Sequence, residues 1–220
     1  MARSMPALLL ACAALVVGIS AAGCSSDATS SDAAPQVTPS QTASPSLPPV
    51  TPSPATDWKE TKTYRNDYYG FSFEYDSAQY YVEELEDGPD GGFVVYVLED
   101  APAGSPRLFW VRPVSKPRYL ASAPVGQRAL RRLLSQYLSC PEPEGGEVLA
   151  ASVVEVAGQG GVVVDGVVLP TDAAPEEMQY RMYAIPNGKV LCEASIGAPA
   201  ADWRGAWQAL QGIVASLRVY

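Results

Sequence analysis

The sequence predicts one α+β domain at residues 57–220, with two helices packed on a largely antiparallel sheet. Three observations lead to this class. Short alternating or β-branched segments recur along the domain, as expected of strands. Two amphipathic segments, at residues 124–140 and 202–217, have helical spacing. An Asn-Gly pair at residues 187–188 lies between apolar segments and is typical of a β-hairpin.

The first strands are indicated by alternation and by β-branched content. Aromatic residues alternate with polar ones at residues 71–75, as in a strand with one buried face. Residues 92–98 and 107–114 are rich in valine and aromatic residues, which favour strands. In the second of these segments, Trp110 and Arg112 share one face because side chains alternate along a strand.

The first helix is predicted between Pro124 and Cys140. Its apolar residues follow the spacing of one helix face: Leu130, Leu133, Leu134, Tyr137 and Leu138. Its arginines lie off that stripe: Arg128, Arg131 and Arg132. They are expected to form a solvated face, with contact to an anionic lipid or a partner as the alternative.

Strands return after this helix. Residues 153–156 and 162–169 are valine-rich and are joined through glycines, which predicts a hairpin turn rather than a nucleotide-binding loop. A two-residue turn at Asn187-Gly188 would set Tyr183 opposite Cys192 and point Cys192 inward. The last helix carries apolar residues spaced four and three apart from Trp203 to Leu217, with Asp202 as its expected cap.

The N-terminus predicts export. Residues 1–23 have a positive start, a short apolar core and small residues before Cys24, which is typical of a signal peptide. The sequence Ala21-Ala22-Gly23-Cys24 resembles a bacterial lipobox, so Cys24 is expected to carry the lipid, including acyl chains such as palmitate. The alternative is an ordinary signal peptide cut nearby. The lipid would anchor the chain to the cell membrane on its extracytoplasmic face.

Residues 24–56 are predicted to be the lipid anchor and a disordered stalk. Ser, Thr, Pro and Ala make up 25 of the 32 residues after Cys24, and none is aromatic. Such a segment buries too little apolar surface to offset its ordering entropy. The excess of Arg over Lys and the abundance of Ala, Gly and Val suggest a GC-rich genome such as that of an actinobacterium.

Composition excludes several functions. The chain has no histidine, so His-based catalytic triads and His-ligated metal sites are absent. A net charge of −9 disfavours nucleic acid as a partner. No Walker loop, nucleophile elbow or C-x-x-C motif occurs, and no cofactor, metal site or catalytic residue is predicted.

The domain resembles a known family at its opening. Tyr64-x-Asn66-x-x-Tyr69-Gly70-Phe71-Ser72-Phe73-Glu74-Tyr75 is similar to the start of PsbP-like domains and of the related LpqN-type lipoproteins of actinobacteria. The Asn-Gly-Lys hairpin and the Trp-bearing last helix also fit. Asp76 departs from the family, which usually has proline there. The resemblance implies an α/β/α sandwich and a non-enzymatic accessory or binding function.

Two cysteines remain in the exported domain, Cys140 and Cys192. In an oxidising compartment such a pair is readily a disulfide, which would tie the end of the first helix to a strand. Two buried free thiols are the alternative.

Acidic residues cluster before the glycines at 91–92: Glu83, Glu84, Glu86, Asp87 and Asp90. We expect a solvated acidic turn, because the spacing fits no EF-hand loop. The same residues leave a carboxylate-based hydrolase of a cell-wall polymer as an alternative function.

Tyrosines are concentrated at the start of the domain, and five are candidate binding residues: Tyr64, Tyr68, Tyr69, Tyr80 and Tyr81. Exposed tyrosines suit wet interfaces. Core packing of alternate members is the other interpretation. The sequence therefore predicts a membrane-anchored binding module for an envelope protein or a glycolipid, with a structural assembly factor as a further alternative.

Overall fold

The chain is described by a computed structural model at residues 51–54, 57–86, 92–99, 107–120, 125–139, 146–156, 158–170 and 176–220. The predicted signal peptide, Cys24, most of the predicted stalk and Cys140 lie outside the described residues. Asp87 and Asp90 of the acidic cluster also lie outside them.

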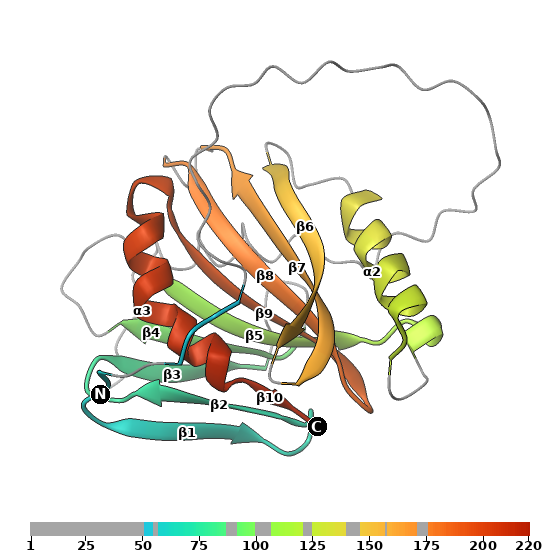
Figure 1. The fold of residues 1–220 in the computed structure, drawn as a ribbon. Coiled ribbons are helices and arrows are strands. Elements are labelled where there is room, and N and C mark those ends of the chain that lie inside the picture. The colour runs from blue at the N-terminus through green and yellow to red at the C-terminus, as the bar shows by residue number, and fades with distance from the viewer. Residues whose placement is uncertain are drawn as a thin grey trace.

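The described strands form two antiparallel sheets (Figure 1). The small sheet has the order β1 (Thr61–Asn66), β2 (Phe71–Asp76) and β10 (Arg218–Val219). The large sheet has the order β3 (Tyr80–Leu85), β4 (Val94–Glu99), β5 (Leu108–Ser115), β9 (Val190–Pro199), β8 (Met178–Pro186), β7 (Gln159–Val168) and β6 (Gly146–Val156). Every strand pair in both sheets is antiparallel, as predicted.

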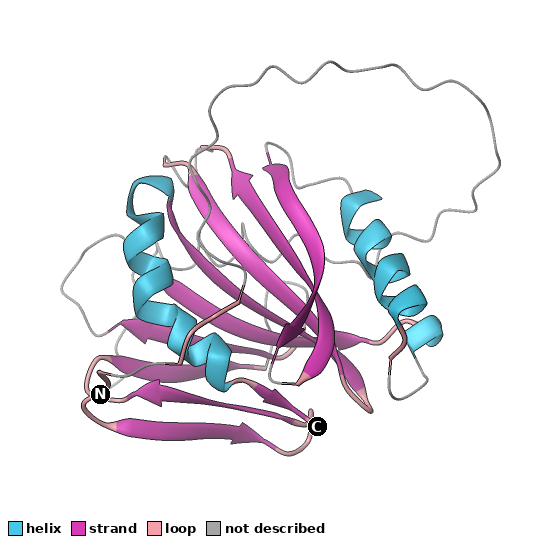
Figure 2. Cartoon of the chain, in the orientation of Figure 1, coloured by secondary structure: helices cyan, strands magenta, loops and turns pink. Residues whose placement is uncertain are grey.

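Helices lie on both faces of the large sheet (Figures 1 and 2). Helix α3 (Trp203–Ser216) and the small sheet cover one face, and α2 (Gln127–Ser139) packs on the other. Single turns η2 (Arg118–Leu120) and η3 (Ala200–Asp202) precede the two helices. The predicted α+β class, with helices on both faces of an antiparallel sheet, is confirmed.

Helix α3 packs through the apolar seam that the sequence predicts. All members of the seam are buried: Trp203, Trp207, Leu210, Val214 and, just after the helix, Leu217. Ile213, beside the seam, is buried as well. Asp202 occupies the predicted N-cap position, but its side chain makes no hydrogen bond to the helix. Its carboxylate instead accepts hydrogen bonds from Arg107 Nε and Nη2 at 2.7 and 3.1 Å. This ion pair joins the start of α3 to the start of β5.

Helix α2 packs through a narrower surface. Leu130, Leu133 and Tyr137 are buried, but Leu138 is 54% exposed, contrary to prediction. Leu138 follows Tyr137 by about 100° around the helix, which places it at the margin of the apolar stripe. The arginines of α2 are exposed, as predicted.

The β8–β9 hairpin has a different register from the predicted one. Ile185 lies opposite Cys192, and Pro186 lies opposite Leu191. The loop is Gly188-Lys189, because Asn187 N donates to Val190 O at 3.0 Å. The shift of two residues preserves the alternation of faces, so Cys192 still points inward and is fully buried.

Two strands extend into segments that the sequence assigns to loops. Glu83 and Glu84 belong to β3, which pairs with β4, so the acidic residues do not form one turn. Strand β6 begins at Gly146, seven residues before the predicted position 153. The glycine turn between β6 and β7 is confirmed, with Gly158 at φ 79°.

Candidate functional site

The five candidate tyrosines do not share one surface. Tyr80 is 4% exposed and belongs to the core on the α3 side. Tyr81 points to the opposite face of β3, next to Leu98. Tyr64 is half-buried, stacks on Phe73 with ring centroids 5.0 Å apart, and donates from its hydroxyl to Glu84. Tyr81 is 41% exposed on its face of β3, away from the others, so of the five only Tyr68 and Tyr69 lie together at the surface.

Two aromatic residues from distant segments lie beside Tyr68 and Tyr69, Phe93 through a ring contact and Tyr220 through the backbone of the turn. The Tyr68 side chain is 76% exposed, and its ring meets the Tyr69 ring edge-on at 4.8 Å. The Tyr69 ring stacks on Phe93 at 5.0 Å. Tyr220 is exposed and lies under the guanidinium of Arg65, 5.1 Å from its ring centre. We call Tyr68, Tyr69, Phe93 and Tyr220 the aromatic edge.

The turn between β1 and β2 holds this edge in place. Gly70 has φ 75°, and a Cβ at that position would run into the carbonyl oxygen of Tyr220. Tyr220 N donates to Gly70 O at 2.9 Å, which fastens the last residue to the turn. The left-handed backbone and the close approach both require glycine here.

Asn187 connects the hairpin tip to the same turn. Its Nδ2 donates to the carbonyl oxygens of Tyr69 and Gly70 at 2.8 and 3.2 Å. Its Oδ1 accepts from the backbone N–H groups of Lys189 and Val190 at 2.7 and 2.6 Å. Since Asn187 is buried, one side chain satisfies backbone groups of both loops and fixes their relative position.

Two lysines place positive charge beside the aromatic edge. Lys189 Nζ donates to Tyr68 O at 3.2 Å. Lys116 Nζ donates to the carbonyl oxygens of Asn187 and Gly188 at 2.6 and 3.1 Å. The carbonyl groups are neutral, so both ammonium charges remain uncompensated by these contacts. Arg65, in contrast, is paired with Asp67 at 2.6 Å. The edge therefore combines aromatic surface with two lysine ammonium groups that contact only neutral carbonyls.

The other sequence-predicted residues that the structure describes do not come together in a site. No cluster of metal-ligating side chains occurs within the described residues. Glu84 instead accepts the hydrogen bond of Tyr64, and burial together with this bond raises the Tyr64 pKa. Arg132 lies over the ring of Tyr119 at 4.5 Å, while Arg128 and Arg131 are exposed. The arginines thus cover the outside of α2.

Cys192 is a free thiol in the structure and is fully buried on the α3 side of the large sheet. Burial, and secondarily the charge of Glu193, raises its pKa. Cys140 follows α2, which packs on the opposite face of the sheet. The side on which Cys192 lies therefore does not support the predicted disulfide. Because Cys140 itself lies outside the described residues, the pairing stays a prediction.

Sequence reasoning missed two buried ion pairs that link neighbouring strands. Arg112 on β5 donates to Glu193 on β9 at 2.7 Å, and the Tyr137 hydroxyl of α2 donates to the same carboxylate at 2.5 Å. Arg181 on β8 donates to Asp165 on β7 at 2.5 Å. The Arg181 guanidinium also lies 4.5 Å from the ring centre of Trp207. In each pair, the arginine and the carboxylate neutralise one another inside the core.

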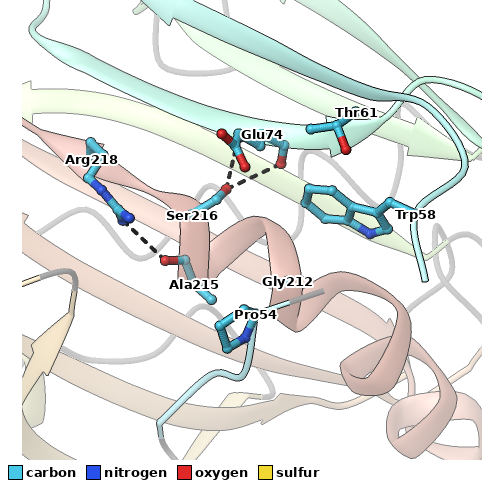
Figure 3. A pocket seen from close by; sticks show the side chains of 8 residues that line it. All are labelled: Pro54, Trp58, Thr61, Glu74, Gly212, Ala215, Ser216 and Arg218. Atoms are coloured by element: carbon cyan, nitrogen blue, oxygen red, sulfur yellow. Dashed lines mark hydrogen bonds between the residues drawn. The ribbon is translucent and has the colours of Figure 1, made fainter. Parts of the chain in front are cut away.

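A pocket of about 350 Å³ lies between α3, the small sheet and the segment that precedes β1 (Figure 3). It is lined by Pro54, Trp58, Thr61, Glu74, Gly212, Ala215, Ser216 and Arg218. The Ser216 hydroxyl accepts from Glu74 N at 2.8 Å and donates to Ile213 O at 2.8 Å, so it joins β2 to the end of α3. The sequence gives no signal for this pocket, since its residues come from three separate stretches of the chain, 54–61, 74 and 212–218.

No protein-family model and no curated protein sequence matches the chain. Among solved structures, it is similar to the cyanobacterial PsbP of Synechocystis, with 14% identity, a TM-score of 0.47, and coverage of 78% of this chain and 99% of that one. LpqN of Mycobacterium tuberculosis, involved in cell envelope biogenesis, has 11% identity, a TM-score of 0.43, and coverage of 63% and 78%.

A protein from Bacteroides thetaiotaomicron has 17% identity and a TM-score of 0.43 over 68% of this chain. The chain spans 45% of that protein's length. At these identities the likenesses concern the fold alone and assign no function. Within the described residues, no helix has the length and apolarity needed to cross a membrane.

Proposed function

We propose that this chain is a cell-envelope lipoprotein whose domain binds a protein partner and catalyses no reaction. Cys24 would carry the lipid on the outer face of the cytoplasmic membrane, and residues 25–56 would act as a stalk. The lipobox-like residues and the Ser/Thr/Pro/Ala-rich composition support the tether.

The aromatic edge is the observation that carries the binding function. Tyrosine presents a large apolar ring and a polar hydroxyl, and it is enriched at protein interfaces. Tyr68 is held out into solvent by a turn whose backbone is fixed from two distant segments. A side chain that is exposed yet rigidly placed loses little entropy when a partner binds.

The lysines beside the aromatic edge indicate what kind of partner surface it would fit. Lys116 and Lys189 border exposed aromatic rings, so the matching surface would be acidic with apolar recesses. The proposed ligand is therefore an acidic surface of an envelope protein.

Site-specific photocrosslinking in intact cells tests this function. A benzoyl-phenylalanine at position 68 is expected to crosslink one protein, and the adduct should disappear when Tyr69→Ala or Lys189→Glu is added. The matched control carries the crosslinker at Leu138, which is exposed on α2, away from the aromatic edge. The same adduct from positions 68 and 138, or an adduct indifferent to both substitutions, would overturn the proposal.

The tether is tested separately. Cys24→Ser should abolish labelling by radioactive palmitate and move the protein from the membrane fraction to the medium or soluble envelope fraction. Retention of both label and membrane association would exclude Cys24 as the lipid attachment site.

A further inference from the structure

We propose that the pocket beside the end of α3 binds a neutral saccharide unit. This proposal is independent of the protein-binding function, because none of the pocket residues belongs to the aromatic edge. Its support comes from the kind of side chains that line the pocket and from how firmly each is held (Figure 3).

Trp58 provides a rigid aromatic wall. The chain on its C-terminal side is fastened to the buried carboxylate of Asp76, which accepts from Lys59 N at 3.1 Å and from Glu60 N at 3.0 Å. Asp76 also accepts from Ala78 N at 3.0 Å. Although burial opposes ionisation, these backbone donors lower the Asp76 pKa. The half-buried indole is thereby pre-positioned as a flat surface for a pyranose ring.

Polar groups face this wall. Within the described part of the chain, no donor contacts the exposed Glu74 carboxylate. Arg218 donates from Nη1 to the carbonyl oxygens of Ala215 and Leu217 at 3.2 and 3.1 Å, which fixes its guanidinium at the end of α3. Its remaining N–H groups have no acceptor among the described residues. The Thr61 hydroxyl adds a further donor and acceptor.

The charges of the pocket balance. One carboxylate and one guanidinium give no net charge, so the pocket favours neither an anion nor a cation. A sugar carries vicinal hydroxyls that donate to a carboxylate and accept from a guanidinium at once, while its ring face packs on indole. A neutral polyhydroxylated ligand is therefore the class that uses every group.

The shape of the pocket allows such a ring to enter. Its floor on α3 consists of Gly212, which has no side chain, and Ala215, which has only a methyl group, so room is left above the helix. Pro54 borders the opening, and its segment is held by a hydrogen bond from Ser53 N to Gln211 Oε1 at 3.2 Å. The volume of about 350 Å³ lies at the lower end of small-molecule sites. One or two sugar units fit this size better than a longer chain.

Fluorine NMR on the purified full chain labelled with 5-fluorotryptophan tests the proposal. The chain has four tryptophans, and Trp58→Phe assigns the resonance of interest. Cellobiose and maltose are the probes, with glucuronate and glucosamine as charged comparisons. We expect a neutral disaccharide to shift the Trp58 resonance alone, with a dissociation constant of about 1 mM, equivalent to about −4 kcal/mol. Glu74→Ala should weaken this affinity about tenfold. The matched control is Glu155→Ala, an exposed glutamate on β6 away from the pocket, and it should not change the affinity.

Three outcomes would overturn the site. The first is the absence of any Trp58 shift with either neutral probe in the folded chain. The second is an equal shift in the Glu74→Ala variant. The third is tighter binding of glucuronate or glucosamine than of the neutral sugars, which would assign the pocket to a charged ligand. Folding of each variant is read from the dispersion of the other three tryptophan resonances.

Discussion

The two faces of the large sheet hold their helices differently. On one face, α3 buries seven residues and contributes both of its tryptophans to the core. On the other, α2 buries three residues, one of which is a tyrosine hydrogen-bonded to a charged pair. Each face also carries one buried ion pair between neighbouring strands. The same sheet therefore attaches α3 through a larger apolar surface and α2 through a smaller one supplemented by a hydrogen bond to a buried carboxylate.

This difference predicts that the α3 layer is more stable than the α2 layer. Free energy from apolar burial scales with the area removed from water, which favours the α3 layer. A hydrogen bond to a buried carboxylate is directional and is lost when the helix shifts. We therefore expect α2 to open locally at lower free energy than α3. Hydrogen exchange of the two helices measures this directly.

The largest expected effect comes from the buried ion pairs. Arg181→Met leaves the Asp165 carboxylate buried without its cationic partner and should lower the free energy of unfolding by about 3–5 kcal/mol. Arg112→Met should be less harmful, because Glu193 keeps the Tyr137 hydroxyl. Chemical denaturation of both variants gives the comparison. An equal loss would show that the tyrosine does not compensate for the missing charge.

Truncating one leucine under each helix compares the two layers by apolar contact alone. Leu210 of α3 and Leu133 of α2 are both fully buried. Each change to alanine should lower the free energy of unfolding by about 2–5 kcal/mol. The loss at Leu210 should lie toward the upper end, because Leu210 is packed in the larger core cluster on the α3 side. A greater loss for Leu133→Ala would reverse the ranking of the two layers.

Asp76 makes the α3 side of the molecule sensitive to acid. Its folded pKa lies below the ordinary value, so the carboxylate stabilises the fold above the unfolded pKa of about 3.9. This contribution is lost as the pH falls through the folded pKa. Asp76→Asn should cost about 1–3 kcal/mol at neutral pH and progressively less below pH of about 4. Unfolding curves at several pH values check the trend, and a pH-independent difference would contradict it.

The smallest effect is expected at Tyr137. Tyr137→Phe removes one hydrogen bond to Glu193 while keeping the ring, so the loss should be about 1–2 kcal/mol. Amide exchange in α2 should accelerate more than in α3. Unchanged exchange in α2 would mean that its apolar residues alone hold it.

Sequence patterns predicted the parts of the fold that local periodicity specifies. The seam of α3, the inward direction of Cys192 and the antiparallel hairpin all follow from spacing along one segment. The predicted hairpin register is wrong because Asn187 uses its side chain to bind the backbone of Tyr69 and Gly70, more than a hundred residues away. No local turn rule contains that contact.

The candidate site was less predictable for the same reason. Tyr68 and Tyr69 are neighbours in sequence, but Phe93 and Tyr220 reach them only through the folded sheet order. Arg112 and Glu193 lie 81 residues apart and meet because β5 pairs with β9. Tyr80 and Tyr81 are the same residue type as Tyr68 and Tyr69, so the sequence does not distinguish them. Strand β3 directs Tyr80 into the core and Tyr81 to the opposite face.

The central place of β9 has a consequence for how the chain folds. This strand joins β5 to β8 and so connects two halves of the sheet, β3-β4-β5 and β8-β7-β6. Among the described residues, the halves share no other strand pairing. It is the last long strand in the sequence. The halves can unite only after residues 190–199 have emerged, and their non-local pairing predicts slow folding, in milliseconds to seconds. That delay keeps the two halves of the sheet apart until residues 190–199 are available.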